Sequence, residues 1–169
     1  LYPYFVKDLE NVVGSLEGKA ILEIGCGPGF MLEQLSKAHP KLLVGVDISQ
    51  DMLNRAKTRC GSATLIRGDV SYLPLENSTF DVVFSRGSVF FWKDLPLAFS
   101  ELQRVTKANG CGLIGGGYGL STPKDLIDKI KSARTSNSSN IPKLNLHKLV
   151  QMVTELGDKA SILSKKGSG

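Results

Sequence analysis

The sequence predicts an α/β fold of the Rossmann-like, doubly wound type: a mostly parallel sheet with helices on both faces, which together form a three-layer sandwich. Two observations support this class. Five short apolar runs, near 20–24, 42–47, 63–67, 80–85 and 111–116, alternate with segments of helical spacing. The first run also leads directly into glycines at every second position, which is typical of a strand that ends in a tight turn.

The turn after the first predicted strand is the most informative segment of the chain. Gly25, Gly27 and Gly29, with Cys26 among them, have no Cβ atoms, so a ligand can lie directly on the backbone amides. The segment from Phe30 onward has the spacing of an amphipathic helix. The turn therefore leads into a helix N-terminus, where N–H groups without intrahelical partners and the positive end of the helix dipole face the ligand.

Acidic residues near this turn indicate which ligand it binds. In the dinucleotide fingerprint G-x-G-x-x-G the third glycine comes one residue later, where this chain has Phe30. Glu23, on the strand before the turn, would repel a pyrophosphate. Asp47 ends the second predicted strand, where an acidic group accepts ribose hydroxyls, and Ile48 beside it can cover an adenine. These residues favour an adenosine ligand without a pyrophosphate and disfavour a nicotinamide oxidoreductase.

The other elements are marked by helix-starting residues. Helices are expected to begin after Ser49, after Asp94 and at Thr122. The third of these is expected to turn an apolar stripe inward, made of Leu126, Ile127 and Ile130. Asn145 is expected to cap a last helix that ends at Gly157, after a polar loop at 134–140. A sixth strand is expected at 160–165, with the last strand of the sheet missing from the chain.

Four motifs occur in a fixed order along the chain. They are Glu-Ile-Gly-Cys-Gly-Pro-Gly at 23–29, Val-Gly-Val-Asp-Ile-Ser at 44–49, Gly-Asp-Val at 68–70 and Phe-Asp-Val-Val-Phe-Ser at 80–85. In this order and spacing they resemble class I S-adenosylmethionine-dependent methyltransferases, and most of all the small-molecule branch of the ubiquinone-biosynthesis type. The resemblance covers residues 20–118 well and the rest loosely.

The resemblance implies that S-adenosylmethionine is the cofactor, that S-adenosylhomocysteine is the product, and that a defined set of residues binds them. This set comprises Glu23, Gly25, Cys26, Gly27, Gly29, Asp47, Ile48, Met52, Gly68, Asp69, Val70, Ser85 and Arg86. The glycines would line the methionine and ribose, Asp47 would bind the ribose hydroxyls, and Asp69 would accept from the adenine amine. Three apolar side chains would enclose the adenine: Ile48, Met52 and Val70. Ser85 and Arg86 would lie beside the reacting methyl group, although for Arg86 a surface or structural ion pair is slightly favoured.

The function implied is direct, in-line methyl transfer to a small-molecule acceptor. The alternative is a regulatory or partner subunit that binds S-adenosylmethionine without transferring its methyl group. No general base is assigned, because lone histidines such as His39 and His147 more often serve no catalytic role. We expect one domain over 1–169, in which the short segment 119–158 forms the substrate side.

Composition is consistent with a cytoplasmic protein. Of the net charge of +5, residues 1–118 contribute nothing (12 basic, 12 acidic) and residues 119–169 contribute all (9 basic, 4 acidic). We interpret this as a solvated basic surface rather than a nucleic-acid site, since aromatic residues are not interleaved with the lysines. Cys26, Cys60 and Cys111 fit no metal or disulfide pattern, and no apolar run reaches membrane-spanning length. The oligomeric state is left open.

Overall fold

The computed structural model describes residues 1–133 and, beyond them, Asn145, His147, Val150, Gln151 and Thr154. The polar loop expected at 134–140 and the sixth strand expected at 160–165 lie outside the described residues. Of the last expected helix, from Asn145 to Gly157, only these five residues are described, and the four after Asn145 are helical.

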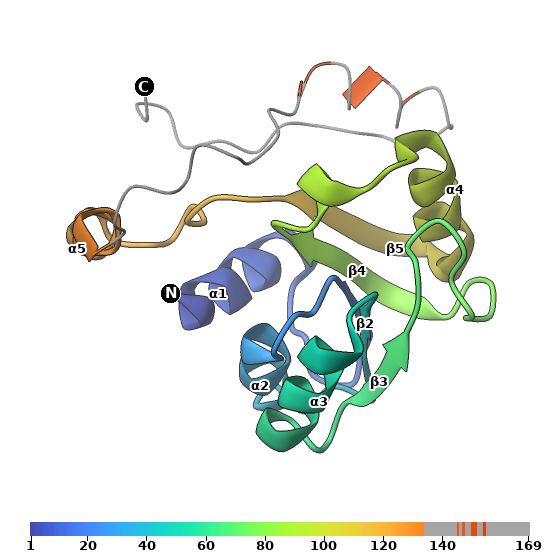
Figure 1. The fold of residues 1–169 in the computed structure, drawn as a ribbon, viewed down its shortest axis with the longest axis horizontal. Helices are drawn as coiled ribbons and strands as arrows, with labels where there is room; N and C mark the ends of the chain where they lie inside the picture. The colour runs from blue at the N-terminus through green and yellow to red at the C-terminus, as the bar shows by residue number, and fades with distance from the viewer. Residues whose placement is uncertain (134–144, 146, 148–149, 152–153, 155–169) are drawn as a thin grey trace.

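The centre of the molecule is a sheet of five parallel strands (Figure 1). The strands are β1 (Ala20–Ile24), β2 (Leu42–Asp47), β3 (Thr64–Arg67), β4 (Phe80–Arg86) and β5 (Thr106–Gly115), in the order β3-β2-β1-β4-β5. The chain runs outward from β1 to β3 and then crosses back to β4 on the other side of β1. In open parallel sheets, ligands bind at the carboxyl ends of the strands where the direction of winding reverses, here between β1 and β4.

Helices cover both faces of the sheet, which confirms the predicted three-layer class. On one face lie α1 (Tyr2–Val13), α2 (Phe30–Ser36) and α3 (Gln50–Arg59); on the other lies α4 (Leu95–Val105) (Figure 1). Successive strand residues point to opposite faces, so Ile21 packs with α1, α2 and α3 whereas Leu22 packs with α4. Both side chains are fully buried.

Two of the three predicted helix starts are confirmed by their caps. The Ser49 hydroxyl accepts from the Met52 amide at 3.4 Å, and the Asp94 carboxylate accepts from the Leu97 amide at 2.9 Å. Thr122 is different, because its hydroxyl donates to the carbonyl oxygen of Tyr118, four residues earlier in the chain. The helix that follows, α5 (Lys124–Ala133), begins two residues later.

The apolar stripe of α5 is less buried than the sequence predicts. Leu126, Ile127 and Ile130 are only half-buried, and none of the residues of α5 is buried within the part of the chain that the structure describes. The physical reason is its position: α5 follows a segment that leaves the end of β5 and carries the helix away from the sheet (Figure 1). The stripe is nevertheless the less exposed side of α5, because the other residues of the helix are all exposed, so the predicted direction agrees with the structure while the burial is incomplete.

Strand β5 begins earlier than the sequence predicts. Thr106 pairs with Phe80, but the next regular pair joins Val82 to Cys111, so residues 107–110 form an excursion opposite Asp81. Asp81 fixes this excursion, because its carboxylate accepts from the Lys107 ammonium at 2.8 Å and from the Ala20 amide at 2.8 Å. These bonds lower the pKa of Asp81, with the Lys107 bond contributing most. Regular pairing resumes at residue 111, where the apolar run predicted it.

The N-terminal helix α1 is fastened to the segment that follows β5. The buried carboxylate of Asp8 accepts from the amides of Leu120 at 2.6 Å and Ser121 at 2.8 Å. The sequence separation of more than a hundred residues makes this a purely tertiary contact. At the start of α1, Tyr2 lines the same pocket as Gly25, which follows β1, and Arg86, which ends β4.

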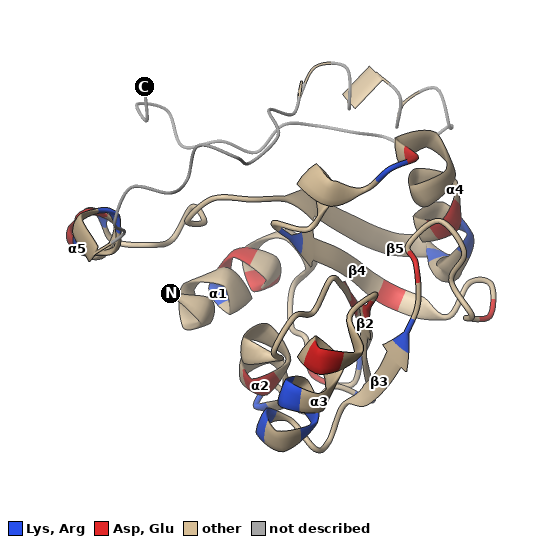
Figure 2. Cartoon of the chain, in the orientation of Figure 1, with Lys and Arg blue, Asp and Glu red and all other residues tan. Residues whose placement is uncertain are grey.

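The charges of the described residues are spread over the surface in both signs (Figure 2). On α3, for example, Asp51 and Arg55 form an exposed ion pair at 3.0 Å. The excess positive charge predicted for 119–169 falls largely on residues outside the described part. None of the described helices combines the length and the apolar character that a membrane crossing requires.

Candidate functional site

The glycine turn after β1 has the backbone conformation that the sequence predicts. Gly25, Gly27 and Gly29 all have positive φ, at 70°, 52° and 80°. A Cβ on Gly25 would lie 2.3 Å from the Cβ of Ser88, and one on Gly29 would lie 3.0 Å from Ala56. A Cβ on Gly27 would meet no atom of the described residues within 4 Å. Two glycines are thus required by close packing, while the middle one leaves open space.

Hydrogen bonds to the neighbouring strand hold the turn in place. The amides of Gly25 and Cys26 both donate to the carbonyl oxygen of Val46 on β2, at 2.8 Å and 3.1 Å. The amide of Gly27 donates to the carboxylate of Asp47 at 2.8 Å. Three hydrogen bonds to β2 therefore fix the backbone of the turn.

Asp47 lies at the carboxyl end of β2 and bridges two loops. One of its oxygens accepts from Gly27 N, and the other accepts from the amide of Ser49 at 2.9 Å. An ionised carboxylate has about four lone-pair directions, so capacity for two further donors remains. Next to it, Ile48 is 63% exposed, which is unusual for a large apolar side chain at the end of a core strand.

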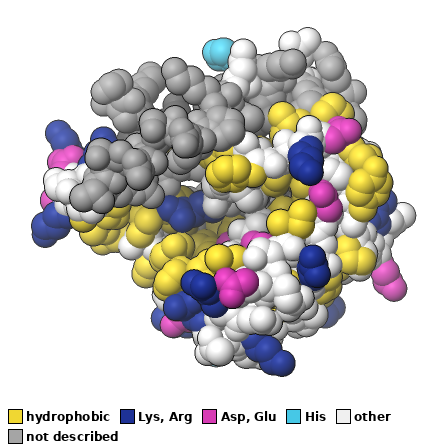
Figure 3. All heavy atoms as spheres, in the orientation of Figure 1, with side chains coloured by type: hydrophobic (Ala, Val, Ile, Leu, Met, Phe, Trp, Pro, Cys, Tyr) yellow, Lys and Arg dark blue, Asp and Glu magenta, His cyan; other side chains and the backbone are white. Residues whose placement is uncertain are grey.

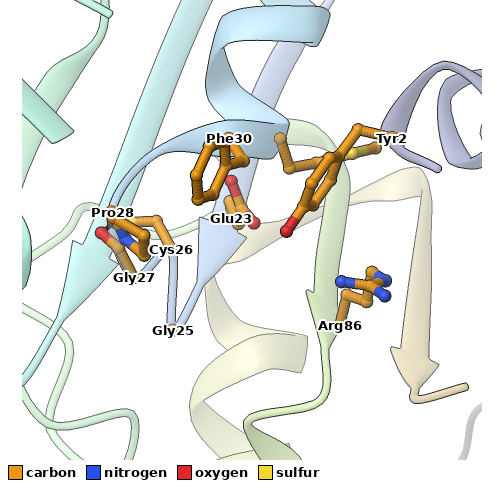
Figure 4. Close-up of a pocket in the computed structure, with 9 residues that line it drawn as sticks. Tyr2, Glu23, Gly25, Cys26, Gly27, Pro28, Phe30 and Arg86 are labelled. Carbon is orange, nitrogen blue, oxygen red and sulfur yellow. Dashed lines mark hydrogen bonds between the residues drawn. The ribbon is translucent and has the colours of Figure 1, made fainter. Parts of the chain in front are cut away.

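A pocket of about 130 Å³ opens beside the turn (Figure 4). Five of the predicted residues line it: Glu23, Gly25, Cys26, Gly27 and Arg86. Four others line it that were not assigned to the cofactor from the sequence: Tyr2, Pro28, Phe30 and Met31. Figure 3 shows hydrophobic side chains gathered on this face of the molecule, with charged side chains among them. The pocket therefore combines apolar walls with a carboxylate and a guanidinium.

Glu23 is the most unusual group in this pocket. Its side chain comes from β1 in the middle of the sheet, lies with Phe30 and Tyr2 in the lining of the pocket, and is only 4% exposed (Figure 4). One carboxylate oxygen, Oε2, has no hydrogen-bond partner among the described residues. Burial raises the pKa of Glu23 well above its ordinary value; the nearby Arg86 opposes this shift and Asp47 adds to it. A buried acceptor that receives no hydrogen bond costs free energy. This oxygen is therefore a position where a ligand could donate a hydrogen bond.

We expect Glu23→Gln to stabilise the ligand-free protein at alkaline pH. Because its folded-state pKa is raised, the contribution of Glu23 to stability is greatest below the ordinary pKa of 4.5 and falls as the pH rises toward the raised value. The loss is at most about 1.4 kcal/mol per pH unit. Urea unfolding at pH 5 and pH 8 should therefore show a gain for the variant that is larger at pH 8. If the variant gained the same free energy of unfolding at pH 5 and pH 8, that result would contradict the burial of an ionisable carboxyl at this position.

Aromatic rings and cations form a continuous stack along the edge of the pocket. The rings of Tyr2 and Phe30 stack at 5.4 Å between centroids. The Arg59 guanidinium lies 3.8 Å from the Phe30 centroid, and Arg86 lies 5.2 Å from Tyr2 and 4.2 Å from Phe5. The stack joins α1, α2, α3 and β4. Arg86 also donates to the carbonyl of Gly117 at 3.2 Å, so the structure brings it both to the pocket and to a structural contact.

The predicted adenine side lies at the ends of β2 and β3. The Gly68 amide donates to the carbonyl of Asp47 at 3.1 Å, which brings the Gly-Asp-Val motif next to β2. Asp69 is exposed, and its carboxylate accepts from the Ser71 amide at 2.9 Å. Met52 is half-buried on α3, whereas Val70 is only 7% exposed and packs in the core with α4.

Ser85 does not line the pocket but lies beneath its edge. It is 3% exposed, and its hydroxyl is 2.6 Å from the hydroxyl of Ser88. Ser88 was not singled out from the sequence. It follows β4 and precedes η1 (Val89–Phe91), a short 3-10 helix that the apolar periodicity did not predict. Only the tertiary structure shows that its side chain reaches the glycine turn.

Two reactive residue types near the motifs are not placed for catalysis. Burial raises the pKa of the Cys26 thiol, with Glu23 and Asp47 adding to the shift, so the thiol stays protonated and is a poor nucleophile. His39 follows α2, and its carbonyl accepts from the amide of Gly18 just before β1. It thus lies at the amino ends of the strands, on the edge of the sheet opposite the pocket.

Together these features define a class of protein: a Rossmann-like domain with a glycine turn after β1 and a facing aspartate at the end of β2, without the dinucleotide fingerprint. The family described as "Methyltransferase domain" matches residues 22–114, more than half of the chain. This chain belongs to that family, and its cofactor is S-adenosylmethionine.

Individual relatives are consistent with this family. A malonyl-[acyl-carrier protein] O-methyltransferase of Legionella pneumophila is 36% identical over 97 residues, which cover 55% of this chain and 34% of that protein. A trans-aconitate 2-methyltransferase of Afipia carboxidovorans is 30% identical over 137 residues, 80% of this chain and 50% of that protein. This chain therefore spans a third to a half of these relatives.

A solved structure shows the same fold over nearly the whole chain. It comes from Methanococcus maripaludis and is assigned as an S-adenosyl-L-methionine-dependent methyltransferase. The two superpose with a TM-score of 0.80 and 30% sequence identity, covering 92% of this chain and 76% of that one.

Proposed function

We propose that this chain binds S-adenosylmethionine at the glycine turn and transfers its methyl group to a small-molecule acceptor. The observation that carries the proposal is the pocket of Glu23 and Arg86. A buried carboxylate oxygen that has no partner among the described residues faces a space that also contains a guanidinium. The amino acid end of the cofactor has one ammonium and one carboxylate, so this pair of opposite charges is complementary to it.

The remaining contacts of the cofactor are proposed from the site residues. Asp47 would hold the two ribose hydroxyls, in line with its remaining acceptor capacity. The exposed side chain of Ile48 would gain a cover from the adenine ring, with Met52 and Val70 on the other side. Asp69 would accept from the adenine amine. The open space at Gly27 would admit the cofactor against the backbone, between Gly25 and Gly29.

The residues of the chain would mainly position two reactants and exclude water. Bound S-adenosylmethionine supplies a methyl group on a sulfonium, which is already a good leaving group. Orientation of this kind is worth about 7–11 kcal/mol of a reaction barrier. The aromatic stack of Tyr2 and Phe30 would shield the site from solvent. No general base is proposed, since none is required when the acceptor atom attacks without losing a proton first.

A small acceptor is favoured over a polymer. The two relatives compared above are named for a malonyl group on a carrier protein and for trans-aconitate, both of which are small acidic units. The segment 119–158, much of which lies outside the described residues, is proposed as the acceptor side of a single domain. The cysteine usage favours a reducing, cytoplasmic setting.

Two measurements test this function in sequence. Calorimetric titration with S-adenosylmethionine, S-adenosylhomocysteine and NADH should show binding of the first two only. Incubation of the protein and S-adenosylmethionine with a panel of small carboxylic acids should then produce S-adenosylhomocysteine. Binding without turnover across a wide acceptor panel would favour the regulatory alternative, and binding of NADH alone would overturn the proposal.

A further inference from the structure

Ser88 joins three elements that meet beside the glycine turn. Its hydroxyl donates to the carbonyl of Ile24, the last residue of β1, at 3.1 Å. The indole of Trp92 donates to the same hydroxyl at 3.1 Å, and the Ser85 hydroxyl is 2.6 Å away. Although Ser88 precedes η1, its side chain makes no capping bond to that helix. The hydroxyl of Ser88 instead bonds to Ile24, Ser85 and Trp92.

The donors and acceptors fix the direction of every bond in this cluster. A carbonyl can only accept and an indole N–H can only donate, so the proton of Ser88 goes to Ile24 and one of its lone pairs receives Trp92. Ser85 must then donate its proton to the second lone pair of Ser88. All three positions of the Ser88 hydroxyl are used. Replacing it would leave the Ile24 carbonyl and the Trp92 indole without this partner at once.

Ser88 also lies directly against the backbone of the turn. A Cβ built on Gly25 would be 2.3 Å from the Cβ of Ser88 and 2.5 Å from its hydroxyl oxygen. The turn is therefore held between two sides: β2 binds its amides through Val46, and Ser88 supports the opposite side. Gly25 lines the pocket, so the position of Ser88 sets the position of a pocket wall.

We propose that Ser88 is a positioning residue of the cofactor site, which holds the glycine turn in its binding shape and links it to Trp92. This inference rests on the proposed cofactor site. Trp92 packs edge-on against Phe99 of α4, at 5.9 Å between centroids, so the link reaches from the pocket wall to the opposite helix layer. Because Ser88 contacts both the turn and the indole, the environment of the indole should respond to a ligand bound against the turn.

The test uses Ser88→Ala, which removes the hydroxyl without adding volume, and Ser100→Ala as the matched control on the exposed side of α4. Calorimetry with S-adenosylhomocysteine should show a Kd that is about fivefold to tenfold higher for Ser88→Ala, as expected for the loss of one or two hydrogen bonds. The control should bind as the wild type does. Trp92→Phe, which removes only the indole donor, should raise the Kd about twofold to threefold.

Trp92 is the single tryptophan of the chain, so its fluorescence provides a second readout. In the wild type, S-adenosylhomocysteine should change the emission; in Ser88→Ala at saturating ligand, this response should be lost. A purely structural serine would lower the thermal unfolding midpoint but leave both the Kd and the emission response unchanged, and that result would overturn the inference. If the wild type itself does not bind the ligand, it is the proposed function that fails.

Discussion

Replacement of Asp47 by alanine is expected to raise the Kd for S-adenosylmethionine and S-adenosylhomocysteine by at least a hundredfold. Two ribose hydroxyls would lose a charged acceptor, and each such bond is worth roughly 1.5–3 kcal/mol. The amides of Gly27 and Ser49 would lose the same carboxylate, at 2.8 Å and 2.9 Å. The change therefore removes both a ligand contact and a support of the binding turn. Isothermal titration calorimetry measures the effect directly.

Asp51→Ala is the matched control for this prediction. Asp51 is an acidic residue four positions along the chain that is exposed on α3, where it forms an ion pair with Arg55 at the surface. Its loss should leave the Kd within about twofold, since exposed pairs of this kind contribute little. An Asp47→Ala protein that is folded and still binds with nearly unchanged affinity would show that the ribose lies elsewhere.

Gly25→Ala is expected to lower the free energy of unfolding by about 2–5 kcal/mol, through left-handed backbone strain and overpacking together. The backbone at Gly25 has φ of 70°, which disfavours any residue with a Cβ. The added Cβ would also lie 2.3 Å from the Cβ of Ser88, far inside a normal carbon contact. Urea unfolding followed by circular dichroism gives the free energy, and binding of S-adenosylhomocysteine should be lost in parallel.

Gly27→Ala separates the effect of backbone strain from the effect of overpacking. Its φ of 52° imposes a similar backbone strain, but its Cβ would enter open space. It should therefore cost only about 1–2 kcal/mol of stability. In the same way, Ser88→Gly should partly rescue Gly25→Ala, because it removes the atom that the new methyl group meets. Equal destabilisation by both glycine substitutions, with no rescue, would contradict the contact between the turn and Ser88.

Local sequence patterns were sufficient for the strands and the cofactor turn. Glycine is favoured where φ is positive or where another backbone comes close. A strand buried on both faces has a continuous run of apolar residues. Both signals lie within a few consecutive residues, so they can be recognised in the sequence. For the same reason, Asp47 could be placed at the end of β2 and the caps at Ser49 and Asp94 could be identified. The resemblance added the assignment of S-adenosylmethionine, which the matching family bears out.

The tertiary structure decided which residues join the five predicted ones in the lining of the pocket. Tyr2 reaches Phe30 because Asp8 fastens α1 to residues more than a hundred positions away, and Ser88 reaches Ile24 across 64 positions. The four-residue excursion of β5 and the incomplete burial of α5 also depend on neighbours that no local pattern names. A periodicity records which residues one element buries. It does not record which distant element covers them, so only the folded structure shows that one oxygen of Glu23 is buried without a partner among the described residues.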